Sequence, residues 1–91
     1  MPIIDWTAAA RADLAAIIRY IAIRNPTAAR RLRDAIHESV LPIREYPLLY
    51  RVGRVAGTRE IVVHPNYIVI YRVRTDRIEI IAVVHARRRY P

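Results

Sequence analysis

Arginine, histidine and tyrosine are the residues of this sequence that could do chemistry on a charged substrate. Arginines bind phosphate groups through charge-assisted hydrogen bonds. Beside an acid–base pair they can also support metal-free cleavage of RNA. In that reaction a base activates the 2′ hydroxyl, an acid protonates the leaving 5′ oxygen, and arginines stabilise the charged phosphorane. The residues with suitable chemistry are Arg59, His85, Arg87 and Tyr90.

A binding surface is the alternative use of the same arginines. Residues 51–91 carry nine arginines against three acidic residues, so most of the positive charge lies in this half of the chain. A single surface arginine is usually only solvated, but a group of six favours a partner that carries phosphates or an excess of carboxylates. The six are Arg51, Arg54, Arg59, Arg87, Arg88 and Arg89.

Other kinds of reaction chemistry are not indicated. The three histidines have no carboxylate at ligand spacing and cysteine is absent, so we expect no metal site. Ser39 lies inside a predicted helix, where its hydroxyl is expected to bond to a helical carbonyl. Gly53 and Gly57 do not have the spacing of a phosphate-binding loop, and we expect no cofactor.

Length and composition predict one small folded domain, residues 1–91. The chain weighs 10.6 kDa and 54% of its residues are hydrophobic, which is too many for a disordered basic tail. Its 16 basic residues are all arginine and face 8 acidic ones, which gives a net charge of +8. No apolar run has the roughly 18 residues of a membrane span. The N-terminus lacks the pattern of a secretory signal, so we expect a cytoplasmic protein with no membrane partner.

The first half of the chain predicts a short strand and a helical hairpin. Residues 2–6 are apolar and begin with proline, as an edge strand can. Helices are expected over 8–24 and from 26 towards 46, although Pro42 should kink the second helix or end it early. Good N-caps precede both helices, at Thr7 and Asn25. The apolar stripe of the second helix consists of Ala29, Leu32, Ile36, Val40 and Ile43.

The second half of the chain predicts three antiparallel strands after an irregular segment at 46–57. The strands are expected at 58–64, 67–74 and 77–84, joined by turns. The last two strands are apolar on both faces, so we expect the helical hairpin to cover one face and a tail or a partner to cover the other. The order is β-α-α-β-β-β, an α+β fold with a helical hairpin packed on a small antiparallel sheet.

Four groups of short motifs follow one another along nearly the whole chain. They are Asp13-Leu14 with Tyr20-Ile21-Ala22 and Asn25-Pro26, Gly53-Arg54-Val55 with Gly57-Thr58-Arg59-Glu60, Asn66-Tyr67-Ile68-Val69-Ile70-Tyr71-Arg72, and Val83-Val84-His85-Ala86-Arg87-Arg88. In this order and at these spacings, the motifs resemble the RelE/ParE superfamily of toxins from bacterial type II toxin–antitoxin modules. The similarity is strongest on the ParE side, including the ParE toxins paired with PaaA-type antitoxins.

The resemblance implies a toxin held inactive by an acidic antitoxin, whose C-terminal segment wraps the helical hairpin and sheet. RelE-type members cleave mRNA in the ribosome with basic residues on their strands, but Ile61 and Ile68 stand where two of these would be. ParE-type members lack the nuclease set and interfere with DNA gyrase. We therefore expect a ParE-like toxin that is not an enzyme, with a RelE-like mRNA endonuclease as the alternative.

A basic nucleic-acid-binding module without toxic activity is a third hypothesis. The sequence contains no recognisable helix-turn-helix, and the strands offer only Tyr67 and Tyr71 for stacking on bases. Expression decides this point, because a plain binding module should not arrest growth.

Overall fold

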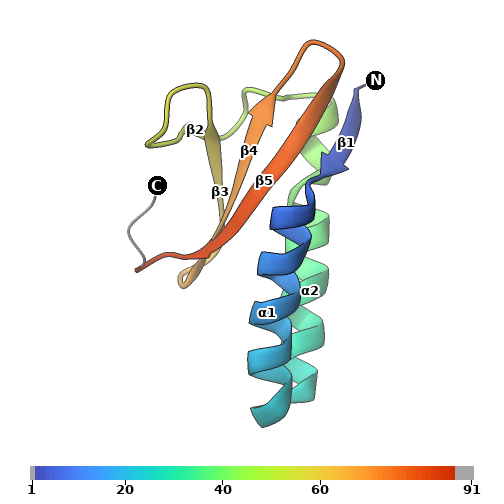
Figure 1. The fold of residues 1–91 in the computed structure, drawn as a ribbon, viewed down its shortest axis with the longest axis vertical. Helices are drawn as coiled ribbons and strands as arrows, with labels where there is room; N and C mark the ends of the chain where they lie inside the picture. Colours follow the sequence, from blue (N-terminus) through green and yellow to red (C-terminus); the bar gives the residue numbers. More distant parts are fainter. Residues whose placement is uncertain (1, 88–91) are drawn as a thin grey trace.

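Five strands form one sheet in the order β1-β5-β4-β3-β2, and a helical hairpin lies against one of its faces (Figure 1). The computed structural model describes residues 2–87. The strands expected from the sequence are present as β1 (Ile3–Trp6), β3 (Arg59–His64), β4 (Tyr67–Val73) and β5 (Arg77–His85). β1 is an edge strand, as predicted, and runs parallel to β5, whereas the other neighbours are antiparallel. The α+β class and the helical hairpin on a sheet are confirmed.

A short additional strand, β2 (Arg51–Val52), forms the opposite edge of the sheet. It lies inside the segment predicted to be irregular, and its residues pair with Glu60 and Arg59 of β3. Two residues are too few to show an alternating pattern, so periodicity could not predict this strand.

Side-chain caps set the starts of both helices where the sequence predicts them. α1 (Ala8–Arg24) begins after Thr7, whose hydroxyl oxygen accepts a hydrogen bond from the Ala10 amide at 3.2 Å. The same hydroxyl donates to the Ile80 carbonyl at 3.0 Å, which joins the start of α1 to β5. α2 (Pro26–Ser39) begins after Asn25, whose side-chain oxygen accepts from the Ala28 amide at 3.0 Å.

The second helix ends before residue 46, which confirms the prediction that Pro42 ends it early. α2 stops at Ser39, and Pro42 lies in a separate 3₁₀ helix, η1 (Leu41–Arg44). Proline has no amide hydrogen to donate to the preceding turn, so a continuous α-helix cannot pass through it without losing a hydrogen bond.

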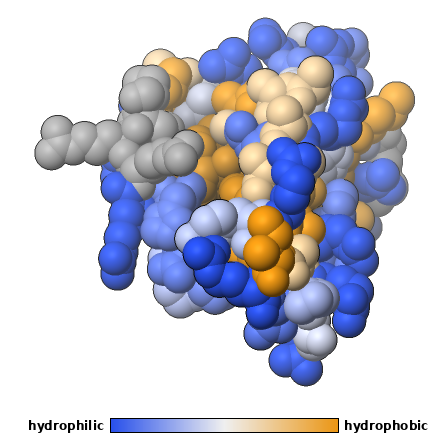
Figure 2. Space-filling view, turned by 60° about the horizontal axis from the view of Figure 1, so that its bottom comes forward, coloured by the Kyte–Doolittle hydropathy of each residue, from blue (hydrophilic) through white to orange (hydrophobic). Residues whose placement is uncertain are grey.

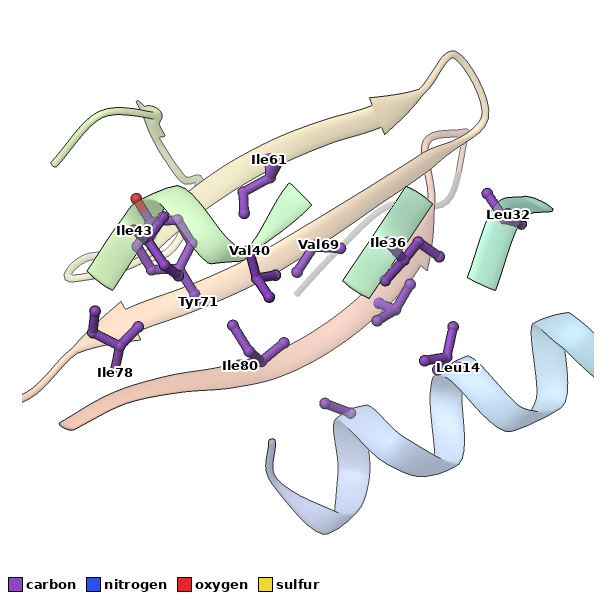
Figure 3. Close-up of a cluster of buried hydrophobic side chains, with 12 residues drawn as sticks. Leu14, Leu32, Ile36, Val40, Ile43, Ile61, Val69, Tyr71, Ile78 and Ile80 are labelled. Atoms are coloured by element: carbon purple, nitrogen blue, oxygen red, sulfur yellow. The ribbon is translucent and has the colours of Figure 1, made fainter. Parts of the chain in front are cut away.

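The hydrophobic core lies between the hairpin and the near face of the sheet (Figure 3). The predicted stripe of the second helix is buried along its whole length, across α2 and η1. Each large side chain buried here contributes about 1.5–3 kcal/mol relative to an exposed one. The sheet contributes Ile61, Val69, Tyr71, Ile78, Ile80 and Val83 to this core.

Alternation along the sequence predicts that Ile78, Ile80, Ala82 and Val84 share one face of β5, and this prediction is wrong from Ala82 onwards. Regular alternation would place Ala82 on the same face as Ile80. The pairing with β4 instead shifts by one residue, so that Ile80 lies opposite Tyr71 and Ala82 opposite Ile70. The extra residue forms a β-bulge, and Val83 joins Ile80 in the core. A bulge leaves no mark in a purely apolar run, so the sequence could not reveal it.

The far face of the sheet is buried at its centre as well. Ile68 and Ile70 of β4 are absent from the core cluster beneath the helices, yet they are only 6% and 4% exposed. The expectation that a tail or a partner covers this face stays a prediction.

Asp13 joins α1 to β5 and offers a test of this packing. Its Oδ2 accepts a hydrogen bond from the Val83 amide at 3.1 Å. Asp13→Ala leaves that amide without its acceptor at a partly buried site, so we expect the free energy of unfolding to fall by about 1–3 kcal/mol. Asp13→Asn keeps a carbonyl oxygen and should lose less. Urea denaturation measures both, and equal losses would show that the hydrogen bond is not the cause.

Candidate functional site

Two adjoining hollows lie where the helical hairpin meets the turn between β3 and β4, one on each side of Tyr67. The first, of about 670 Å³, is lined by Ile21, Asn25, Ala28, Arg31, Val63 and His64, among others. The second, of about 630 Å³, is lined by Asp13, Ala16, Ile17, Tyr20, Val83, His85 and Arg87. We call the two hollows together the hairpin groove. Figure 2 looks towards this end of the molecule and shows hydrophobic surface between hydrophilic flanks.

Two histidines flank the Tyr67 ring in this groove. The ring centroids of His64 and His85 lie 5.9 and 5.3 Å from that of Tyr67. Nδ1 of each histidine accepts a backbone hydrogen bond, from Asn66 at 3.1 Å and from Arg87 at 3.2 Å respectively. A neutral imidazole that accepts at Nδ1 carries its proton on Nε2. In its neutral form each histidine can therefore donate a hydrogen bond from Nε2.

Arg59, the other main residue of the predicted nuclease set, lies towards the opposite end of the sheet. It pairs with Tyr71, whereas His85 pairs with Tyr67, and four residues of β4 correspond to about 13 Å. The Arg59 guanidinium donates to the carbonyls of Tyr50 at 2.9 Å and Leu48 at 3.4 Å. His85 and Arg87 thus lie together in the groove without Arg59. Tyr90 lies outside the described residues.

The six arginines of the predicted partner surface are divided in the same way. Arg51, Arg54 and Arg59 lie on or beside β2 and the start of β3, whereas Arg87 lines the groove. Arg88 and Arg89 lie outside the described residues. The Arg51 Nε donates to the Oε1 of Glu60 at 2.8 Å, and Glu60 is only 5% exposed. The four described arginines of this set therefore lie at two ends of the sheet, three at one end and Arg87 at the other.

The two positions that depart from a nuclease pattern are both interior. Ile61 is 2% exposed and packs in the core, and Ile68 is 6% exposed on the far face. A cation at Ile61 would be buried among apolar side chains, at a high cost in desolvation. These positions supply packing in this chain and no phosphate contacts.

Sequence reasoning missed the loop at 46–52, which the fold holds firmly. The Tyr71 hydroxyl donates to the Pro47 carbonyl at 2.6 Å, and the Tyr50 hydroxyl donates to the Ser39 carbonyl at 3.2 Å. Burial raises the pKa of the Tyr71 hydroxyl, which keeps it protonated and able to donate. The available signal was Leu48-Leu49, two large apolar residues in a segment with no expected helix or strand.

Three further features bear on the expectations from the sequence. The Ser39 hydroxyl donates to the Ile36 carbonyl at 2.7 Å, as predicted for a polar side chain inside a helix. Within residues 2–87, no three histidine, aspartate or glutamate side chains gather as a metal site would require. None of the helices in that part of the chain combines the length and apolarity needed to cross a membrane.

Known proteins are similar to this chain in sequence, and one solved structure is similar to it in fold. A putative toxin, Y4kP of Sinorhizobium fredii, is 39% identical over 89 residues, which cover 97% of this chain and 92% of the relative. Toxin RelE2 of Caulobacter vibrioides is 37% identical over 83 residues, covering 91% and 93% of the two chains. A solved structure of the chromosomal ParDE toxin–antitoxin system from P. aeruginosa superposes with a TM-score of 0.83 at 26% identity, covering 93% of this chain and 96% of that one.

The family model that matches is the ParE toxin of the type II toxin–antitoxin system parDE, and the match spans residues 4–90. That range includes both helices, the hairpin groove and the five strands except Ile3, the first residue of β1. Membership in a type II system implies an antitoxin as partner. The chain belongs to the ParE toxin family.

Proposed function

We propose that this ParE family member inhibits growth by binding a protein of the replication machinery in the cytoplasm, with DNA gyrase as the first candidate, and that it does not cut RNA. The separation of Arg59 from His85 carries this proposal. Cleavage needs an acid, a base and a charge-stabilising cation around one phosphate. Here the Arg59 guanidinium donates hydrogen bonds to two backbone carbonyls, and the His85 Nδ1 accepts a hydrogen bond from the Arg87 amide. Because these groups are far apart and already hydrogen-bonded within the chain, the surface is better suited to binding than to catalysis.

The hairpin groove is the proposed binding site of the cognate antitoxin. Its walls include the apolar side chains of Ile17, Ile21 and Val63, and Arg31 and Arg87 line it as well. An acidic amphipathic segment could bury its apolar face there and place carboxylates beside the arginines. The net charge of +8 on the whole chain would speed the encounter with such a segment.

A RelE-like mRNA endonuclease is the second candidate. It is supported by the 37% identity to Toxin RelE2 and by the way Asp13, His85 and Arg87 line the same hollow. This candidate makes His85 essential as the acid, whereas the binding proposal does not.

Replacing His85 separates the two candidates. We expect His85→Ala, expressed without antitoxin, to inhibit growth about as strongly as the wild type, because no proton transfer is required. An endonuclease would lose about 10²–10⁴-fold in rate on removal of its acid or base. His64→Ala is the matched control, since His64 makes the same kind of Nδ1 bond and also packs against Tyr67. Loss of growth inhibition in His85→Ala alone would favour the endonuclease.

Purified gyrase tests the proposed target. Addition of the toxin in molar excess should inhibit DNA supercoiling, and prior addition of the cognate antitoxin should restore it. Normal supercoiling at excess toxin would remove gyrase as the target and leave another replication protein to be identified.

A further inference from the structure

A second apolar surface lies at the other end of the sheet from the hairpin groove. It consists of Tyr46, Leu48, Leu49 and Val52, which we call the loop patch. These residues are 61%, 64%, 57% and 67% exposed. Clusters of exposed large apolar side chains often mark surfaces that bind another molecule, and here four occur within seven residues of chain. The patch is therefore a candidate interaction surface.

Hydrogen bonds to the rest of the fold hold the loop that carries the patch in place. Its backbone carbonyls accept hydrogen bonds at Pro47 from Tyr71 (2.6 Å) and at Tyr50 from Arg59 (2.9 Å). The Tyr50 side chain in turn bonds to the end of α2 through the Ser39 carbonyl at 3.2 Å. Tyr71, which is fully buried, anchors the loop to the centre of the fold. The exposed side chains thus stand on a fixed backbone, which lowers the entropy lost on binding.

Charges beside the patch indicate the chemistry of its partner. The loop and the strands beside it, residues 44–60, contain four arginines against two acidic residues, Glu45 and Glu60, and Glu60 pairs with Arg51. The excess is therefore two positive charges. Arg51 is oriented by its 2.8 Å bond to the buried Glu60 carboxylate, and its own side chain stays 60% exposed. A complementary surface would offer apolar side chains flanked by carboxylates.

We infer that the loop patch is the surface with which the toxin engages its protein target, and that the target meets it with apolar side chains bordered by carboxylates. The inference rests on the proposed function, since it assumes a toxin that acts by binding. The patch adjoins β2 and the start of β3, whereas the hairpin groove adjoins the β3–β4 turn, at the other end of β3 (Figure 1). Toxicity and antitoxin binding therefore use different residues, and the antitoxin blocks the target by its bulk.

The test uses the full chain with two pairs of substitutions at exposed positions. The first variant is Leu48→Asp/Leu49→Asp. The matched control is Ile3→Asp/Ile23→Asp, which places the same charges at residues that are 68% and 82% exposed and lie outside the patch. Each variant is expressed without antitoxin to score growth, and each purified protein is titrated with the cognate antitoxin. Circular dichroism reports whether each variant is folded.

The loop variant should weaken target engagement about 100-fold or more, because two apolar contacts are replaced by charges that repel carboxylates. Cells that express it should grow at the rate of the empty vector, while its affinity for the antitoxin stays within about threefold of wild type. The control variant should arrest growth as the wild type does. If Leu48→Asp/Leu49→Asp fails to fold, Leu48→Ala/Leu49→Ala carries the same expectation with a smaller loss.

Growth arrest by a folded loop variant at wild-type strength would overturn the inference. Simultaneous loss of toxicity and of antitoxin binding in a folded loop variant would also overturn it, because the patch would then belong to the antitoxin interface. A wild-type chain that does not arrest growth is a different result, which removes the proposed function and this inference with it.

Discussion

Replacing Ile80 by alanine is expected to lower the free energy of unfolding by about 2–5 kcal/mol, which is the usual range for emptying a large buried site. Ile80 is completely buried in β5, opposite Tyr71 of β4 and Trp6 of β1. A chain of this length has a total stability of about 5–14 kcal/mol, so the loss is a large part of it. The melting temperature should fall by about 4–8 °C for each kcal/mol lost.

Ile23→Ala is the matched control for this prediction. Ile23 is 82% exposed at the end of α1, so the same truncation removes almost no buried surface. Its effect should stay within about 0.5 kcal/mol. Thermal and urea unfolding of both variants measure the difference, and similar losses would contradict the placement of the core.

Replacing Tyr20 by alanine is expected to raise the dissociation constant for the antitoxin about 30-fold or more, as for a tyrosine at the centre of an interface. Tyr20 lines the hairpin groove and is 62% exposed, and the Arg24 guanidinium lies 4.6 Å above its ring. The ring therefore lines the groove and has a cation over one of its faces. Isothermal titration with the purified antitoxin gives the affinity.

Tyr46→Ala provides the comparison, because Tyr46 is 61% exposed and belongs to the loop patch instead of the groove. Its affinity for the antitoxin should remain close to wild type. If Tyr20→Ala and Tyr46→Ala weaken antitoxin binding equally, the antitoxin is not confined to the hairpin groove. The groove would then not be its specific binding site.

Much of the fold could be predicted from local sequence signals. Thr7 and Asn25 fixed the starts of the helices because their side chains satisfy free amides at those ends. Pro42 marked the end of the second helix for a steric reason that holds in any context. The strands of the second half were visible as β-branched runs between turn residues.

The candidate site was harder to predict because it depends on pairing between distant segments. The bulge in β5 and the two-residue strand β2 arise from register, which a single sequence does not display. The sequence suggested that Arg59 stabilises a phosphate. In the structure its guanidinium instead donates to backbone carbonyls about ten residues earlier in the chain. Charge and residue type identified the arginines, but only the pairing of strands showed that they lie at two ends of the sheet.

The order in which macromolecular synthesis stops tests the central claim most directly. Cells that express the chain without antitoxin are labelled for DNA, RNA and protein synthesis in one culture, and their mRNA is mapped for cuts. The account predicts that DNA synthesis falls first, while translation continues and mRNA stays intact. Immediate arrest of translation with mRNA cut at the ribosomal A site would contradict it and would establish the endonuclease instead.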